Sequence, residues 1–88
     1  MAHNYPNPFN PETTIRFSVP TSGNVKIDIY NIRGQRVTTL LNETLNYGHH
    51  SAVWNGTDSN GRSVGSGVYF YRIHAGGENV TNRMLLMK

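Results

Sequence analysis

Cysteine is absent from this chain of 88 residues, and so is any apolar run of the roughly 20 residues needed to span a bilayer. The lack of cysteine excludes disulfides, thiolate metal sites and cysteine nucleophiles, although it does not place the protein inside the cell. No basic stretch followed by an apolar core marks a signal peptide. The length fits one small domain, which we expect to cover residues 5–88, with residues 1–4 as a linker or expression remnant.

Charge is also scarce, because only 15% of the residues are Asp, Glu, Lys or Arg. The formal net charge of +3 comes from eight Lys and Arg against five Asp and Glu. The basic residues are scattered along the chain and form no stripe, so nucleic acid is not an expected partner. Abundant Asn, Gly, Thr, Tyr and Val favour strands and tight turns over helices.

Alternation of apolar and polar residues predicts six strands and no helix. The predicted strands are Thr13–Val19, Asn24–Tyr30, Gln35–Asn42, His49–Trp54, Gly67–Ala75 and Val80–Met87. Ser63–Ser66 forms a seventh, very short strand or none. The pattern predicts an all-β, two-sheet antiparallel sandwich of six to seven strands, with a six-stranded barrel as the alternative.

The second strand, the leucine doublet of the third strand and the proline-rich segment each lead to a further expectation. On the second strand, Lys26, Asp28 and Tyr30 should point away from the core. The Leu40-Leu41 doublet breaks the alternation and predicts a bulge or a strand end. The proline-rich segment Asn4–Pro11 should be extended without ladder bonds of its own, because proline lacks an N–H group.

Metal and calcium chemistry find little support. His49 and His50 are adjacent on a predicted strand, so their side chains point to opposite faces and cannot chelate one ion. His3 and His74 are isolated in sequence. Asp58-Ser59-Asn60-Gly61 lacks the bidentate glutamate of a calcium loop, and we interpret it as an Asx-turn, leaving open a weak calcium site at Asp58. We therefore expect no cofactor and no metal.

Catalytic groups do not assemble in the sequence. The five carboxylates are dispersed and no nucleophile-elbow motif is present, so we do not expect an enzyme. The acidic residues are Glu12, Asp28, Glu43, Asp58 and Glu78.

Aromatic side chains keep a second hypothesis open. Tyr30, Tyr47 and Trp54, if exposed and coplanar, would suit an ancillary carbohydrate-binding or structural sandwich module of a multidomain extracellular glycoside hydrolase. We interpret Trp54 as a core residue instead. A third hypothesis is an assembly module with a self-pairing edge, as a monomer or a weak edge-strand dimer.

Four segments together resemble a known family. They are Tyr5-Pro-Asn-Pro-Phe-Asn-Pro, Ile29-Tyr-Asn-Ile-Arg-Gly-Gln-Arg-Val37, Trp54–Arg62 continuing through Ser66-Gly-Val-Tyr-Phe-Tyr-Arg72, and Arg83-Met-Leu-Leu-Met-Lys88. In order and spacing they resemble the type A C-terminal sorting domain of type IX secretion cargo. That family is similar to the immunoglobulin-like domain of the flagellar hook-capping protein, which implies an immunoglobulin-like sandwich.

The resemblance implies a non-catalytic sorting signal that directs its parent protein from the periplasm across the outer membrane of a Gram-negative bacterium. The implied partners are the type IX translocon, a surface sortase that removes the domain and anchors the cargo, and the N-terminal cargo domain. The cargo ends at the cell surface or in the medium. The implied recognition residues are Gly67, Val68, Tyr69, Arg72, Arg83, Met84, Leu85, Leu86, Met87 and Lys88, and the domain-start motif is Pro6, Asn7, Pro8 and Phe9.

Two arginines fit this role on physical grounds as well. Arg72 and Arg83 lie on adjacent predicted strands and form a basic spot for recognition, or else they are edge charges that block aggregation. A partner that reads the last strand could also pair with its free edge.

Overall fold

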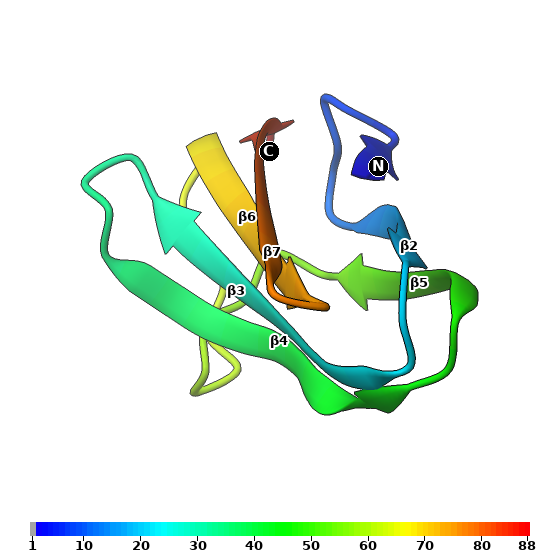
Figure 1. Ribbon diagram of the computed structural model, residues 1–88. Coiled ribbons are helices and arrows are strands. Elements are labelled where there is room, and N and C mark those ends of the chain that lie inside the picture. Colours follow the sequence, from blue (N-terminus) through cyan, green and yellow to red (C-terminus); the bar gives the residue numbers. More distant parts are fainter. Residues whose placement is uncertain (1) are drawn as a thin grey trace.

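We describe a computed structural model of the chain that covers residues 2–88 (Figure 1). Seven strands account for most of these residues, and none of them is helical. The strands are β1 (Ala2–Tyr5), β2 (Thr13–Val19), β3 (Gly23–Asn31), β4 (Arg36–Leu45), β5 (Gly48–Trp54), β6 (Gly67–Ala75) and β7 (Glu78–Leu86). Within this range no helix has the length and apolar character needed to cross a membrane.

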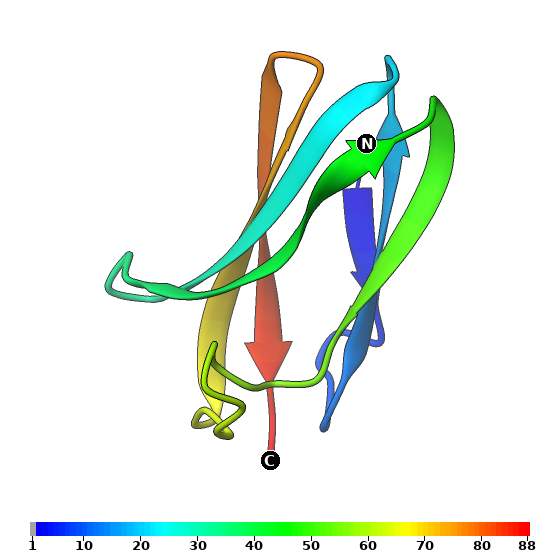
Figure 2. The ribbon, with the colours of Figure 1, turned by 90° about the horizontal axis from the view of Figure 1, so that it is seen from below.

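The strands form two antiparallel sheets, which Figure 2 shows as facing layers. Sheet A has the order β1-β2-β5, and sheet B has the order β4-β3-β6-β7. The chain crosses between the sheets three times, after β2, β4 and β5, which is the Greek-key pattern of an immunoglobulin-like sandwich. The predicted sandwich is therefore confirmed, and the barrel alternative is wrong.

The core lies between the two sheets and is built from the inward residues of each strand. Alternation along β2, β3 and β6 places every second side chain inside, as predicted. Trp54 closes one end of the core and is only 1% exposed, so its interpretation as a core residue is confirmed. The buried apolar residues are Phe9, Ile15, Phe17, Val19, Val25, Ile27, Ile29, Trp54, Tyr69, Tyr71, Ile73, Ala75, Met84 and Leu86.

The seventh strand is not where the sequence suggested it. Ser63–Ser66 contributes only an isolated bridge from Ser63 to Thr57. Instead, Ala2–Tyr5 pairs with β2 in register from Ala2↔Phe17 to Tyr5↔Thr14. Residues 2–4 therefore belong to sheet A, although their composition gives no strand signal.

Strand β4 is longer and more irregular than predicted. Its pairing with β3 continues to Leu45, which leaves Asn46 and Tyr47 as the connection where a loop from 43 to 48 was expected. The predicted irregularity at the leucine doublet is confirmed as a bulge, because Leu41 pairs with Ile27 while Thr39 pairs with Asp28. Leu40 and Leu41 both pack against the core as a result.

Asp28 lies on the outer side of sheet B, as its position predicts, but it is buried. Its carboxylate accepts a hydrogen bond of 2.7 Å from Oγ1 of Thr39 on β4. Nζ of Lys26 lies 3.7 Å from the same group. A short side chain on an inner strand is covered by longer neighbours, so an outward position does not ensure exposure.

Candidate partner-recognition site

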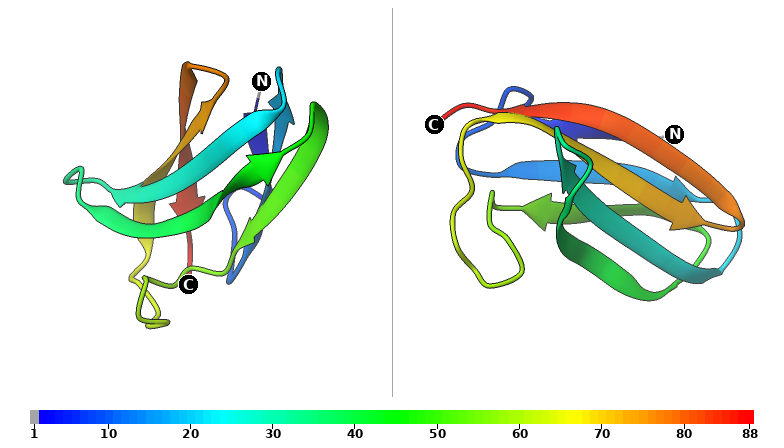
Figure 3. Two further views of the ribbon diagram at one scale, coloured as in Figure 1. Left: turned by 60° about the horizontal axis from the view of Figure 1, so that its bottom comes forward. Right: turned by 90° about the vertical axis from the view of Figure 1, so that its left-hand side faces the viewer.

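The proline-rich lead-in and the last strand, two motifs far apart in the sequence, lie side by side (Figure 3). The backbone N–H of Phe9 donates to the carbonyl of Leu85 at 3.0 Å, and the N–H of Met87 donates to the carbonyl of Phe9 at 3.0 Å. Asn7 adds a side-chain contact, because its Oδ1 accepts a 3.0 Å hydrogen bond from the N–H of Leu85. The lead-in thus covers the end of the free edge of β7.

The expectation that Asn4–Pro11 makes no ladder bonds is wrong. The residues between the prolines keep their donors and acceptors, so Tyr5 pairs with β2 and Phe9 pairs with β7. Thr13 fixes the start of the segment, because its buried Oγ1 donates to the carbonyl of Pro6 at 2.8 Å.

An aromatic cluster anchors this junction from inside. The ring centroids of Phe9 and Trp54 are 5.6 Å apart, and those of Trp54 and Tyr69 are 5.2 Å apart. Their polar atoms are paired, since Trp54 Nε1 donates to the carbonyl of Thr57 and the Tyr69 hydroxyl donates to the carbonyl of Gly65. The tyrosine of the Gly67-Val68-Tyr69 motif therefore holds the fold together.

The predicted recognition residues divide into three groups by burial. Tyr69, Met84 and Leu86 are buried and cannot touch a partner while the domain is folded. Gly67, Val68 and Leu85 are half-buried. The exposed members are Arg72, Arg83, Met87 and Lys88, together with Pro6, Asn7 and Pro8 of the lead-in.

A shallow cavity of about 250 Å³ lies between the exposed parts of the two motifs. Asn7 and Pro8 line one side of the cavity, and Val68, Arg83, Met84 and Leu85 line the other. Beyond it, the N–H of Lys88 donates to Ser66 Oγ at 3.0 Å and directs the tail along the start of β6. Met87 presents an apolar side chain that is 54% exposed.

Arg72 and Arg83 lie on adjacent strands and on the same outer face of sheet B, as their positions predict. Arg83 pairs with Phe70, which is two residues before Arg72 on β6. The guanidinium carbon of Arg72 sits 5.2 Å from the ring centroid of Tyr30. Its Nε also donates to Oγ1 of Thr81 at 3.3 Å, so the side chain is held against the sheet.

Two buried tyrosines have perturbed acidity for structural reasons. Burial raises the pKa of Tyr69 and of Tyr71 above the usual value. In Tyr71 the hydrogen bond from Asn82 partly opposes this rise in pKa. Asn82 also donates to the carbonyl of Ala2 at 2.9 Å, which ties β7 to β1. Both phenols are therefore neutral structural groups at physiological pH.

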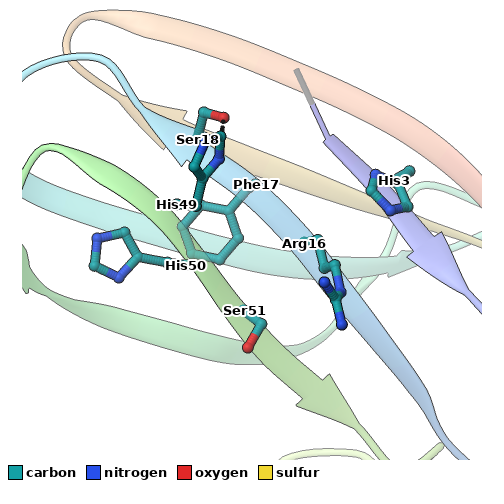
Figure 4. A pocket seen from close by; sticks show the side chains of 7 residues that line it. All are labelled: His3, Arg16, Phe17, Ser18, His49, His50 and Ser51. Atoms are coloured by element: carbon teal, nitrogen blue, oxygen red, sulfur yellow. Dashed lines mark hydrogen bonds between the residues drawn. The ribbon is translucent and has the colours of Figure 1, made fainter.

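Three of the four histidines line a different cavity, on the side of sheet A (Figure 4). The fourth, His74, lies on β6 in sheet B. This open cavity of about 610 Å³ is lined by His3, Arg16, Phe17, Ser18, His49, His50 and Ser51. His49 Nδ1 lies 3.2 Å from Ser18 Oγ, whereas His50 Nε2 donates to the carbonyl of Asn46 at 2.7 Å. The two rings point apart, as predicted. No group of three or more metal-ligating side chains occurs among residues 2–88.

The Asp58 loop has the predicted Asx-turn geometry. Oδ1 of Asp58 accepts hydrogen bonds from the N–H groups of Asn60 and Arg62 at 2.9 and 3.0 Å. Gly61 adopts a positive φ of 80°, which a residue with a side chain would resist. The carboxylate is therefore used in closing the turn.

The aromatic platform required for carbohydrate binding does not form. Tyr47 is 75% exposed, but Trp54 is buried in the core, so the three rings cannot present one flat row. The hypothesis of a sugar-binding module required a flat row of exposed aromatic rings, and the structure does not provide that row.

Comparison with known proteins gives a family match over nearly the whole chain. Residues 3–87 match the family model described as the secretion system C-terminal sorting domain. No curated protein sequence matches the chain at a significant level.

Three solved structures share its fold. Dimeric latent PorU from Porphyromonas gingivalis is similar with a TM-score of 0.78 and 24% identity, over 98% of this chain and 9% of that one. PorZ, described as an essential surface component of the type IX secretion system of P. gingivalis, has a TM-score of 0.64 and 19% identity, over 99% and 11% of the respective chains. FLGD from P. aeruginosa has a TM-score of 0.64 and 24% identity, over 85% of this chain and 59% of that one. The chain thus spans about a tenth of the two secretion-related proteins.

Proposed function

The chain belongs to the family of secretion system C-terminal sorting domains, and on that premise we propose how its residues carry the sorting signal. A domain of this family is a signal for type IX secretion, and it implies export to the cell surface or the medium of a Gram-negative bacterium. The carbohydrate-binding alternative is not favoured.

We propose that the exposed residues at the junction of lead-in and last strand are what the secretion machinery reads. The observation that carries this proposal is the pair of hydrogen bonds joining Phe9 to Leu85 and Met87. They fix the two motifs as one surface, with Asn7 and Pro8 facing Arg83 across the shallow cavity. Buried Tyr69, Met84 and Leu86 act as anchors that hold this surface in place.

The proposed partners are the type IX translocon and a surface sortase, with the cargo attached at the N-terminal side. In this proposal the sorting domain itself catalyses no reaction. The sortase removes it and anchors the cargo, or the cargo is released into the medium. The parent protein's own activity belongs to its other domains.

The proposal is tested with a periplasmic reporter that carries residues 2–88 at its C-terminus in a type IX secreting host. The fusion starts at residue 2 because Ala2–Tyr5 pairs with β2. We expect reporter at the surface or in the medium, and periplasmic retention when residues 83–88 are deleted.

Because that deletion also removes the buried Met84 and Leu86, a second variant keeps the core. Met87→Ser/Lys88→Ala leaves every buried residue and the backbone N–H groups of both positions in place, and we expect a clear loss of export with a near-unchanged melting temperature. Full export of the reporter lacking residues 83–88 would show that the domain is not the sorting signal.

A further inference from the structure

The outer face of sheet B carries a row of two aromatic side chains between two arginines. Tyr30 on β3 pairs with Phe70 on β6, which places the two half-buried rings side by side at the centre of the sheet. Arg36 on β4 pairs with Tyr30, and Arg83 on β7 pairs with Phe70. One row of four side chains therefore crosses all four strands of the sheet.

Basic charge is concentrated around this row. Arg72 lies two residues after Phe70 on β6, and Lys26 lies two residues before the outward position of Asp28 on β3. Both basic side chains are therefore on the same face as the row. Half of the eight Lys and Arg residues of the chain are therefore on this face: Lys26, Arg36, Arg72 and Arg83. Sheet A, in contrast, carries Arg16 as the single Lys or Arg in its three described strands.

The acidic residue of this face offers little compensation. Asp28 is buried, and its carboxylate is already engaged by Thr39 and Lys26. Arg36, Arg72 and Arg83 are exposed and have no salt bridge among residues 2–88. The face is therefore electropositive, and its cations are available to an incoming acidic group.

The shape and residue types favour a protein partner. Side chains at paired positions stand on a pleated sheet, and neither Tyr30 nor Phe70 lines either of the two cavities described above. Tyr, Phe and Arg are the residue types enriched at the centres of protein interfaces. Arg72 is already held over Tyr30, so part of the surface is ordered before binding.

We propose that this face docks on an acidic protein surface. Arg36 and Arg83 pair with carboxylates of the partner, while Tyr30 and Phe70 form the apolar centre of the contact. The inference rests on the proposed sorting function and specifies the chemistry of the protein that recognises the domain.

The first test is an NMR titration of the isotope-labelled chain with poly-L-glutamate. We expect amide shifts on β3, β4, β6 and β7 that weaken as salt is raised. The double variant Arg36→Glu/Arg83→Glu should bind at least about tenfold more weakly. The matched control Arg16→Glu/Arg62→Glu changes the net charge equally at exposed positions off this face, and should lower the affinity by less than about threefold.

Polygalacturonate, which also carries one carboxylate per unit, distinguishes a glycan from a protein partner. Preferential binding of polygalacturonate to this face, equal weakening in both double variants, or no binding of poly-L-glutamate would each overturn the inference.

The export assay separates this inference from the function on which it rests. We expect Arg36→Glu/Arg83→Glu to retain the reporter in the periplasm and the control pair to export it. If the Arg36→Glu/Arg83→Glu fusion is exported normally while the deletion of residues 83–88 is not, the docking face and the role of Arg83 at the junction are both wrong, and the sorting function stands. If that deletion is also exported, the sorting function itself is wrong.

Discussion

The inner and outer sides of the β6–β7 hairpin differ in what their residues can do. On the inner side, Tyr71 and Leu86 are completely buried, and Tyr69 and Met84 are nearly so. On the outer side, Arg72 and Arg83 are exposed and Leu85 is half-buried. Because side chains alternate along a strand, one short motif supplies both sides. A family motif in this hairpin therefore combines residues that build the domain with residues that a partner can reach.

The largest expected effect comes from removing the anchor of the lead-in. Phe9→Ala should destabilise the domain by about 3–5 kcal/mol, because it leaves a cavity beside Trp54. Urea unfolding monitored by tryptophan fluorescence measures the change in free energy of unfolding. Tyr5→Ala is the control, since this ring is 75% exposed and its loss should change the stability by about 0.5 kcal/mol or less. Equal effects of the two substitutions would contradict the role given to the lead-in.

Leu86 and Met87 are adjacent at the end of β7, but the first is buried and the second is exposed. Leu86→Ala should destabilise by about 2–5 kcal/mol because its side chain is completely buried. Met87→Ala, one residue further, should cost about 0.5 kcal/mol or less but reduce export. The same urea titration measures both variants. A large loss of stability in Met87→Ala would place this side chain in the fold rather than on the recognition surface.

A smaller effect is expected where the lead-in meets the free edge of β7. Asn7→Ala removes the acceptor for the N–H of Leu85 and should cost about 1 kcal/mol. Amide hydrogen exchange at Leu85 should accelerate in this variant, because its N–H loses its partner. Asn10→Ala, at another exposed asparagine of the same segment, should leave that exchange rate unchanged.

The smallest expected effect is a pH dependence from the inner side of the hairpin. Because burial raises the pKa of Tyr71 in the folded state, the neutral phenol stabilises the fold below the unfolded pKa of about 10. That contribution is lost as the pH rises from there through the higher folded pKa. Tyr71→Phe should therefore show a shallower fall in unfolding free energy between about pH 9 and pH 11. An identical slope in the wild-type protein and in Tyr71→Phe would contradict this assignment.

Much of the sandwich could be predicted because its strands are half-buried. The bounds of β2 and β6 and the inward residues of β3 follow from alternation, since each strand has one face on the core. The leucine doublet likewise indicated the bulge in β4. Local pattern was sufficient for these features.

The candidate site was predicted only in part, because its contacts are distant in sequence. The bond between Asn7 and Leu85 joins residues 78 positions apart, and neither position signals its partner. Ala2–Tyr5 has too little apolar alternation to indicate a strand, and its pairing depends on the exposed edge of β2. Recognition residues transferred from the family motif included Tyr69, Met84 and Leu86, whose burial appears only once the sheets are assembled.

The most direct test of the central claim, that exposed residues at the end of β7 carry the sorting signal, is the surface yield of a reporter with matched triple variants. One fusion carries Arg83→Ala, Met87→Ser and Lys88→Ala, and its control carries Arg16→Ala, Val53→Ser and Arg62→Ala. Each set removes two exposed cations and one exposed apolar side chain, and leaves the core intact. With both domains folded, we predict that the first fusion stays in the periplasm while the second reaches the surface or the medium. Equal delivery of the two fusions would contradict the account.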